Sequence, residues 1–368
     1  MSEIGLKEVG IRELMARFPA ETSQGAPSAE VLDALRASGV LGLAVPREYG
    51  GRGGDGQAVN RQVAEIARLD PSIAIILFQH YAVTARIVDW GTAEQRRRYL
   101  PRLASGELLA ASAWSEKDAG ADKRNLATTA GPAPGGGWVL NGSKAFTTGA
   151  GIADLYLVLA VTSAPRPGAE SIYGGSGQSF FLVDADRPGV RCDAWTDLVG
   201  MRNSATGFVE FRDCILGEDA MLGPEGEAPR IIAGVRESGA TLGAVSVGIA
   251  DAVYELACEH TAKRGRAEDR TVRHQLVDLK LKVETARAFV ERAGRREGPD
   301  AGMATLLSKL FASDACEEVC HEVTRLLGSS GFSERHPINR WLADARAVSL
   351  MGPTNELCRE LASAGWVN

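Results

Sequence analysis

Two cysteines and a histidine lie close together in the last sixth of the chain and have side chains that bind metal ions. Cys316 and Cys320 are four residues apart, which places them on one face of a helix, and His321 follows directly. Thiolate and imidazole groups are common zinc ligands, but a structural site needs four of them. No second ligand pair stands nearby in the sequence, so we predict no metal site.

A glycine pattern near the amino terminus could form a turn that binds the pyrophosphate of a dinucleotide. Residues 51–56 read Gly-Arg-Gly-Gly-Asp-Gly, and Asp70 follows at a plausible distance for a ribose contact. However, Pro46 and the polar residues 47–49 separate these glycines from the preceding apolar run. No alternating series of strands and helices follows to build a parallel sheet. We therefore predict a surface turn.

The composition is that of a large globular protein that does not bind nucleic acids. The chain has 368 residues, of which 45% are hydrophobic and 24% charged, enough to bury a core in more than one domain. Its formal net charge of -6 lacks the basic excess that phosphate binding requires. The amino terminus does not resemble a signal peptide, and no long apolar run predicts a membrane span. We expect a cytoplasmic protein with reduced cysteines.

The pattern of apolar residues divides the chain into three regions. Residues 1–111 carry apolar residues at helical spacing, for example Val31 and Leu35, and predict an α-helical domain. Residues 112–222 contain short β-branched and aromatic runs separated by glycine and proline, which predicts a β-domain. Helical periodicity returns in residues 223–368 and predicts a helical bundle, so the expected fold class is α+β. The expected strands cover residues 138–140, 155–161, 180–183 and 208–211.

Several sequence motifs occur in a fixed order along nearly the whole chain. The densest is the run Ala113-Trp114-Ser115-Glu116-Lys117-Asp118-Ala119-Gly120-Ala121-Asp122. The others are residues 42–51, 90–101, 140–148, 326–332, 344–346 and 350–356. Together these motifs resemble the acyl-CoA dehydrogenase family. The resemblance implies an amino-terminal α-helical domain, a middle β-barrel or sandwich domain, a carboxy-terminal four-helix bundle, and FAD as the cofactor.

The resemblance assigns one group of residues to the flavin ring. Phe146 would supply an aromatic wall, and Thr148 a hydrogen bond to flavin N5, where the hydride arrives. Without the resemblance, an aromatic residue two positions before a threonine in a strand is typical of core packing. The other residues assigned to the ring and its surroundings are Ala113, Trp114, Ser115, Gly120, Ala121 and Thr147.

A second group is assigned to the rest of the cofactor. In the family, the arginine that matches Arg264 contacts the pyrophosphate. The residues of this second group reach into the flavin site of a neighbouring subunit. The members of the group here are Arg264, Gln275, Arg325, Gly328 and Ser329. Thr354 and Glu356 match residues that close over the other end of the cofactor, where a ribose hydroxyl suits Glu356 better than a phosphate does. The resemblance therefore implies a homodimer or homotetramer.

The family reaction removes a proton next to a thioester carbonyl while a hydride leaves the adjacent carbon for the flavin. This step needs a base, and donors that hold the developing enolate. Glycine occupies position 352, where the family usually has its catalytic glutamate, so Gly352 offers only its backbone N–H to the carbonyl. In some relatives the base stands at a position that matches Ser238, and the nearest carboxylate is Glu237. We expect Glu237 to be either the base or an acidic residue in the first turn of a helix, favoured by the helix dipole.

The substrate implied is an acyl thioester, carried by coenzyme A or by an acyl carrier protein. Relatives that use coenzyme A tend to have a serine and an arginine where this chain has Ala121 and Gly239. A carrier protein needs no nucleotide contacts. That variant resembles the dehydrogenases of polyketide extender-unit biosynthesis, which prepare hydroxymalonyl or methoxymalonyl units. A glyceryl thioester would lose the same two hydrogens and tautomerise to an aldehyde.

Other functions are compatible with these motifs. An ordinary acyl-CoA dehydrogenase is one of them. A flavin monooxygenase of the same architecture uses externally reduced flavin and oxygen, and therefore needs no catalytic glutamate at position 352. A flavin-free binding protein descended from an enzyme is another. The segment 325–356 resembles dehydrogenases more than monooxygenases, so the sequence favours dehydrogenation. No motif identifies the electron acceptor.

Overall fold

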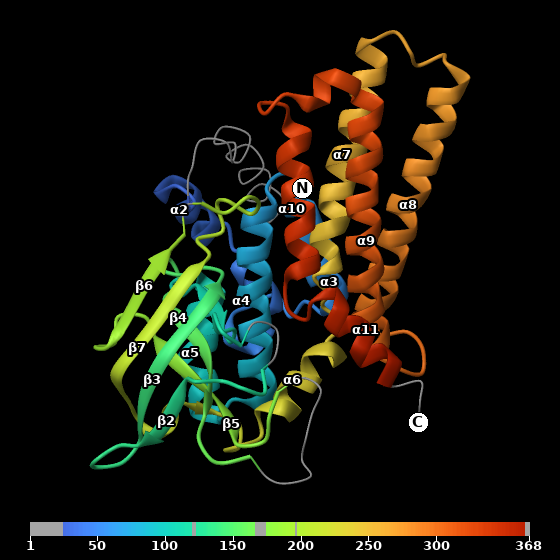
Figure 1. Cartoon of the computed structure of the whole chain (residues 1–368). Coiled ribbons are helices and arrows are strands. Elements are labelled where there is room, and N and C mark those ends of the chain that lie inside the picture. Colours follow the sequence, from blue (N-terminus) through green and yellow to red (C-terminus); the bar gives the residue numbers. More distant parts are fainter. Residues whose placement is uncertain (1–24, 120–122, 166–173, 196, 365–368) are drawn as a thin grey trace. The chain divides into compact units, whose positions relative to one another are not determined.

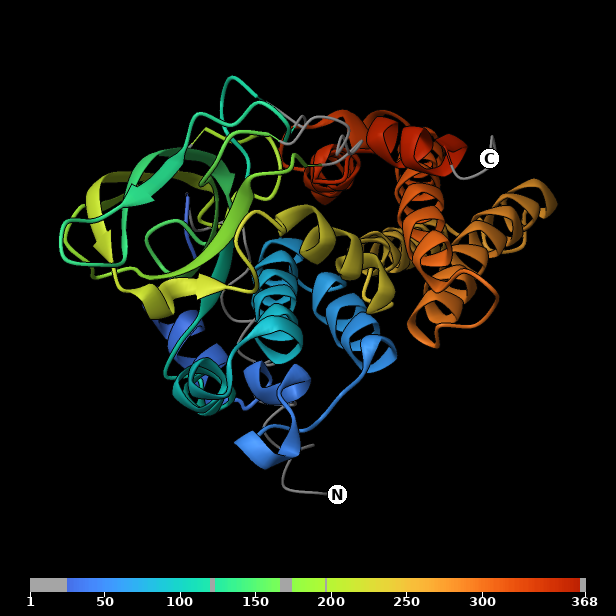
Figure 2. The same ribbon diagram turned by 90° about the horizontal axis from the view of Figure 1, so that it is seen from below.

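A computed structural model describes residues 25–119, 123–165, 174–195 and 197–364 (Figures 1 and 2). The first elements are α2 (Ala29–Ala37), η1 (Leu41–Ala44), η2 (Arg47–Tyr49), α3 (Gly56–Ala67), α4 (Pro71–Trp90) and α5 (Ala93–Ser105). The strands are β1 (Ala110–Ala113), β2 (Thr129–Pro132), β3 (Trp138–Thr147), β4 (Leu155–Val161), β5 (Gln178–Asp184), β6 (Val190–Ala194), β7 (Gly207–Leu216) and β8 (Met221–Leu222), with η3 (Glu218–Ala220) before β8. The last elements are α6 (Ala228–Glu237), α7 (Gly243–Lys263), α8 (Arg270–Gly294), α9 (Ala301–Leu327), η4 (Gly328–Phe332), α10 (Pro337–Leu350) and α11 (Asn355–Ala364). This order of helices, strands and helices confirms the predicted fold class.

The chain groups by contact into two compact units. Unit 1 comprises Met1–Asp55, Ile76–Asp197 and Arg202–Ser238, and unit 2 comprises Gly56–Ile75, Leu198–Met201 and Gly239–Asn368. Unit 1 therefore contains the strands together with helices from the first third of the chain. Unit 2 contains α3 and the carboxy-terminal helices from α7 onward. The sequential domain boundaries after residues 111 and 222 stay a prediction.

The strands of unit 1 form a single sheet in the order β6-β7-β3-β2-β4-β5-β8, with β1 paired to β4. Most neighbours are antiparallel, whereas β1 and β2 each run parallel to β4. The sheet curls round instead of lying flat, as the view in Figure 2 shows. The register between β3 and β7 shifts between Lys144 and Thr147, which marks a β-bulge.

The two central strands β4 and β5 are covered on both faces. On β4, Leu155, Leu157 and Leu159 pack into a core formed with α4, α5 and α6. The alternate residues of β4, such as Tyr156 and Val158, pack into a second core on the other face of the sheet. Because successive side chains of a strand point to opposite faces, a strand buried on both sides must be a continuous apolar run. This explains why β4 is predicted at the same bounds from sequence.

Unit 2 is a helical bundle, as predicted. Helices α7, α8, α9 and α10 pack against one another, and α3 packs on α7 and α8. The approach of α3 to α7 is close, because a Cβ atom at Gly248 would lie 2.3 Å from the carbonyl oxygen of Ala64. A side chain at position 248 would therefore force these two helices apart.

The glycine pattern at residues 51–56 is a turn, which confirms the prediction. The short helices η1 and η2 precede it, so no strand leads into these glycines. A Cβ atom at Gly51 would lie 2.1 Å from the carbonyl oxygen of Val45, because the chain folds back tightly there. The glycine serves this close approach.

Within the described residues, one helix is long and apolar enough to span a membrane, namely α4. Of its 18-residue apolar window, 78% is buried inside the protein. Core helices pass the same test of length and composition.

His80 connects α4 to the strand that leads into the predicted flavin-binding segment. Its Nδ1 atom accepts a hydrogen bond from the backbone N–H of Ala110, 3.2 Å away, at the start of β1. Since Nδ1 accepts, the proton lies on Nε2, which donates to the carbonyl oxygen of Leu41 at 3.1 Å. Burial lowers the pKa of His80 to about 4, so the ring is neutral at physiological pH.

We predict that His80 makes the protein sensitive to mild acid. Below pH 6.5 the unfolded chain binds a proton on this ring that the folded protein does not bind until about pH 4, so stability falls through that window, by up to about 3 kcal/mol. His80→Gln keeps a donor for Leu41 but cannot titrate. Its unfolding midpoint should lie below that of the wild type at pH 7.5, and the gap should narrow towards pH 4.5. A gap that stays constant with pH would contradict this.

Candidate active site

The segment that follows β1 is held by the carboxylate of Glu116. This buried side chain accepts hydrogen bonds from the backbone N–H groups of Ala127 at 2.6 Å and Thr128 at 3.0 Å. Its Oε1 atom also accepts from Lys144 Nζ on β3, at 2.7 Å. One carboxylate therefore connects three separate stretches of unit 1.

The Glu116–Lys144 pair is a buried salt bridge. The Lys144 side chain is fully buried and that of Glu116 nearly so, and Lys144 Nζ also donates to the carbonyl oxygen of Trp114 at 3.3 Å. Burial lowers the pKa of Lys144 to about 8, although the Glu116 charge opposes this. Burial would raise the pKa of Glu116, but the Lys144 charge and the hydrogen bonds outweigh it and hold that pKa below its ordinary value. Both groups are therefore charged at neutral pH.

Phe146 lies on the bulge of β3 and points away from the core. Its φ angle of 54° falls in the left-handed region, which non-glycine residues rarely adopt. The side chain is 62% exposed, and its ring meets Trp195 edge-on at 4.5 Å between centroids. Core packing is thus excluded for Phe146. An exposed ring held by a bulge and a second aromatic residue is suited to form one wall of a planar ligand site.

Two polar atoms of residues assigned to the flavin ring are buried without a hydrogen-bond partner among the described residues. They are Trp114 Nε1 and Thr147 Oγ1. Trp114 itself is fixed by its ring contact with Phe180, at 4.9 Å. Thr148 Oγ1, in contrast, lies 3.3 Å from the hydroxyl of Thr206. Buried polar groups are normally paired, so an orphan donor and an orphan hydroxyl fit a flavin ring, which carries both acceptors and donors on its polar edges.

Ser115 has a partner that the sequence did not reveal. Its Oγ atom accepts a hydrogen bond from Lys123 Nζ at 2.6 Å, and Lys123 is buried. The backbone carbonyl of Ser115 accepts from the N–H of Ala145, which ties this segment to β3. Ala113 is the buried last residue of β1. Gly120 and Ala121, also assigned to the cofactor, lie outside the described residues.

The group assigned to the pyrophosphate lies at one end of the bundle of unit 2. All five residues are exposed: Arg264, Gln275, Arg325, Gly328 and Ser329. They come from the end of α7, the first turns of α8, the last turn of α9 and η4, which meet at the same end in Figure 1. Arg325 also lines an open groove on α9 with Glu318, His321 and Glu322.

Gly352 and Thr354 lie elsewhere in unit 2, between α10 and α11, and Glu356 is the second residue of α11. Gly352 is exposed, and Thr354 caps α11 by accepting from the N–H of Leu357 at 3.2 Å. Glu356 is exposed in the first turn of α11 and pairs with Arg359. Lys309, which anchors this segment, is sixteen residues before Arg325 on α9, or about 24 Å along the helix. The two groups assigned to FAD are thus well separated within one chain, as the predicted sharing of the site between subunits requires. The homo-oligomer itself stays a prediction, which sedimentation would check.

Glu237 is not at the start of a helix, so that expectation was wrong. It is the exposed last residue of α6, and Ser238 follows as the C-cap. The helix dipole disfavours a carboxylate at this end, so it gives no reason for Glu237 to be there.

The cysteines and histidine that motivated a metal site lie on α9. Cys316 and Cys320 are buried, whereas His321 is exposed. In the part of the chain that the structure describes, no group of three or more His, Cys, Asp or Glu side chains could hold a metal ion.

Three family models match the chain in sequence. They are the N-terminal domain of acyl-CoA dehydrogenase over residues 10–107, its middle domain over residues 111–214 and its C-terminal domain over residues 230–366. A probable acyl-CoA dehydrogenase, FadE25 of Mycobacterium tuberculosis, is 32% identical over 95% of this chain and 87% of its own length. An L-prolyl-[peptidyl-carrier protein] dehydrogenase of Pseudomonas fluorescens is 30% identical over 88% of this chain and 86% of its own length.

Solved structures share the fold. Butyryl-CoA dehydrogenase of Megasphaera elsdenii superposes with a TM-score of 0.89 at 27% identity, covering 100% of this chain and 99% of that one. FkbI, a protein for biosynthesis of the methoxymalonyl extender unit of the FK520 polyketide, gives a TM-score of 0.85 at 23% identity, with coverage of 100% and 99%. At that identity the second likeness shows the fold alone.

We predict that the Glu116–Lys144 pair is strongly coupled. Lys144→Met leaves a buried carboxylate without its cation and should cost about 3–5 kcal/mol of unfolding free energy. The double variant with Glu116→Gln should recover part of that loss, since no unpaired charge remains. Arg102→Met, which breaks the exposed Arg102–Glu107 pair, is the control and should cost under about 1 kcal/mol. Urea unfolding of five proteins checks this: the wild type, Lys144→Met, Glu116→Gln, the double variant and Arg102→Met. A loss in the double variant equal to the sum of the two single losses would contradict the coupling.

Proposed function

This chain belongs to the acyl-CoA dehydrogenase family and is an FAD-dependent oxidoreductase, and on that premise we propose that it dehydrogenates an acyl thioester carried by an acyl carrier protein. The observation that carries the proposal is the backbone at Gly239. This is the position at which, by family resemblance, users of coenzyme A have an arginine near the nucleotide. Whether the substrate is carried by an acyl carrier protein or by coenzyme A is therefore argued from whether position 239 has room for a side chain.

The backbone at Gly239 leaves no room for a side chain. Its φ angle is 76°, and a Cβ atom would lie 2.6 Å from the carbonyl oxygen of Ala293 at the end of α8. The Asn60 side chain holds this loop in place, because its Nδ2 donates to the Gly239 carbonyl and its Oδ1 accepts from the N–H of Thr241, both at 2.9 Å. An arginine would need a different loop. The backbone conformation at Gly239 thus excludes the arginine that would contact the nucleotide of coenzyme A. This supports a carrier that has no nucleotide.

A relative with a carrier-bound substrate supports the same reading. The L-prolyl-[peptidyl-carrier protein] dehydrogenase is 30% identical to this chain over most of both sequences. As its name says, that enzyme acts on an L-prolyl group carried by a peptidyl carrier protein. Carrier-linked dehydrogenation is therefore chemistry that a protein of this length and similarity performs.

The chemistry divides between FAD and residues of this chain. FAD, when bound, accepts the hydride that leaves the β-carbon of the substrate. The Gly352 N–H donates to the thioester carbonyl oxygen and so stabilises the negative charge that develops when the α-proton leaves. A carboxylate takes that proton, and the candidate is Glu237. Substrate loses one proton and one hydride, which leaves a double bond between the α- and β-carbons.

A substrate with a hydroxyl group on the β-carbon would give a different product by the same step. The enol that forms after loss of the two hydrogens tautomerises to an aldehyde. A glyceryl thioester is such a substrate, and the reaction would then contribute to a hydroxymalonyl- or methoxymalonyl-type extender unit. This finer assignment is supported by the sequence departures at residues 239 and 352.

We predict that the oxidised flavoprotein is bleached by carrier-bound thioesters under anaerobic conditions. Acyl, glyceryl and hydroxyacyl groups would each be presented on an acyl carrier protein and on coenzyme A, while flavin absorbance is followed. The expected result is faster bleaching at lower concentration with the carrier-protein form. Bleaching by the coenzyme A forms alone would overturn the assignment of the carrier.

We predict that Glu237→Gln slows this bleaching about 100- to 10,000-fold, which is the usual contribution of a general base. Because Glu237 is exposed at a helix end, the variant should keep its FAD content and its unfolding midpoint. Glu227→Gln, which changes an acidic residue at the other end of α6, is the matched control. An unchanged bleaching rate in Glu237→Gln would remove this residue from the mechanism.

A flavin monooxygenase is the second candidate function. It is favoured by Gly352, because that chemistry needs no carboxylate at this position. The anaerobic bleaching experiment distinguishes the monooxygenase from the dehydrogenase. For a monooxygenase, no thioester would bleach the flavin, and oxygen would be consumed only after the flavin is reduced by an external reductant.

A further inference from the structure

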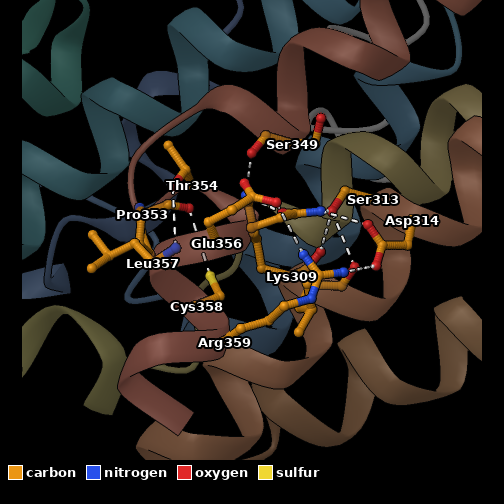
Figure 3. A network of polar contacts seen from close by, with 12 residues as sticks. Lys309, Ser313, Asp314, Ser349, Pro353, Thr354, Glu356, Leu357, Cys358 and Arg359 are labelled. Atoms are coloured by element: carbon orange, nitrogen blue, oxygen red, sulfur yellow. Dashed lines mark hydrogen bonds and ion pairs between the residues drawn. The ribbon is translucent and has the colours of Figure 1, made fainter. Parts of the chain in front are cut away.

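The segment between α10 and α11 is attached to α9 at both of its ends by one lysine. Lys309 Nζ donates to the carbonyl oxygen of Ser349, in the last turn of α10, at 3.3 Å. It also donates to Oδ1 of Asn355, the first residue of α11, at 2.6 Å. The five residues between these two points include Gly352. Figure 3 shows Lys309 reaching from α9 towards this segment.

Asn355 collects further contacts from the same helix. Its Oδ1 accepts a second hydrogen bond from Ser313 Oγ at 3.1 Å, and its Nδ2 donates to Asp314 Oδ1 at 2.7 Å. Asp314 in turn pairs with Arg359 on α11 at 2.8 Å. Lys309, Ser313 and Asn355 are all buried. The start of α11 is thus fixed to α9 by a connected polar network (Figure 3).

The packing of α11 on α9 also has an apolar part. Leu306 of α9 and Cys358 and Ala362 of α11 form an apolar cluster, joined by neighbouring leucines and Met303. Apolar burial therefore contributes to holding the two helices together independently of the polar network. What Lys309 adds is a bond on each side of the connecting segment, which fixes its path.

The charge on Lys309 is held without a carboxylate in contact. In the described part of the chain its hydrogen bonds go to a side-chain amide and a backbone carbonyl, and the Cys358, Asp314 and Glu356 side chains affect its pKa only through space. Burial lowers the pKa of Lys309 to about 8. A buried ammonium group with a lowered pKa reduces the free energy of unfolding, compared with a neutral side chain at the same place. A function beyond folding would account for its presence.

We propose that Lys309 is a positioning residue that fixes the segment containing Gly352, so that the Gly352 N–H is aimed at the thioester carbonyl oxygen. This inference rests on the proposed dehydrogenation. It assigns to a side chain on α9 the task of orienting a backbone donor that has no side chain of its own to anchor it. Lys309 itself touches neither substrate nor cofactor in this scheme.

The test compares Lys309→Met with Lys280→Met in the FAD-loaded protein. The first removes the charge and both donors at similar volume. The second removes a half-buried lysine that pairs with Glu284 on α8 and lies over the Tyr254 ring, away from residues 349–355. At saturating thioester, the bleaching rate of Lys309→Met should fall about 10- to 100-fold, since a displaced donor loses most of its effect. The half-saturating concentration should change less than about threefold, because ground-state binding is retained. Lys280→Met should behave as wild type.

A second readout does not depend on the reaction. Hydrogen exchange followed by mass spectrometry should show faster exchange in a peptide covering residues 349–358 in Lys309→Met, and unchanged exchange in Lys280→Met. Unchanged exchange and an unchanged bleaching rate would overturn the proposal. If no thioester bleaches the wild type, the proposed function fails, and exchange alone decides whether Lys309 fixes the segment. If Lys309→Met does not fold, Lys309→Gln, which keeps one donor, replaces it.

Discussion

The buried ion pair between Glu116 and Lys144 is the contact on which the predicted flavin-binding part of unit 1 depends. It joins the segment after β1 to β3, and Glu116 also receives two backbone N–H groups from the stretch before β2. Taking two charges out of water is costly, and their attraction offsets this only when further hydrogen bonds satisfy the carboxylate. Here they do. The pair fixes backbone next to two residues assigned to the flavin: Lys144 Nζ also donates to the carbonyl oxygen of Trp114, and Lys144 is two residues before Phe146 on β3.

Unit 2 uses a buried lysine in a related way, with a different balance of charge. Lys309 bonds to neutral oxygens, so nothing in direct contact compensates its charge. In both units burial lowers the pKa of a lysine to about 8, and in both the lysine donates to one backbone carbonyl oxygen and to one side chain. Lysine suits this role because a long stem carries a compact donor across several ångströms of apolar packing.

The sequence predicts those features whose physical cause is local. β4 is predicted at the same bounds because burial on both faces demands an unbroken apolar run, and the turn at residues 51–56 follows from its glycines. β1 is missed because Ala110–Ala113 is built of small residues, which carry no strand preference. Glu237 was placed at a helix start although Gly239, in the left-handed conformation typical beyond a helix end, marks the opposite.

The polar contacts of the candidate site depend on residues far apart in sequence and could not be derived from spacing. Lys309 carried a usable signal, since it lies on the apolar stripe of α9 between Thr305 and Ala312, where a solvated lysine would not stand. The backbone at Gly239 carries a consequence for descent. A codon change there cannot restore an arginine, because the loop, Asn60 and the end of α8 have settled around an absent side chain. A relative of this chain with a side chain at position 239 would therefore need a second change that rebuilds the loop.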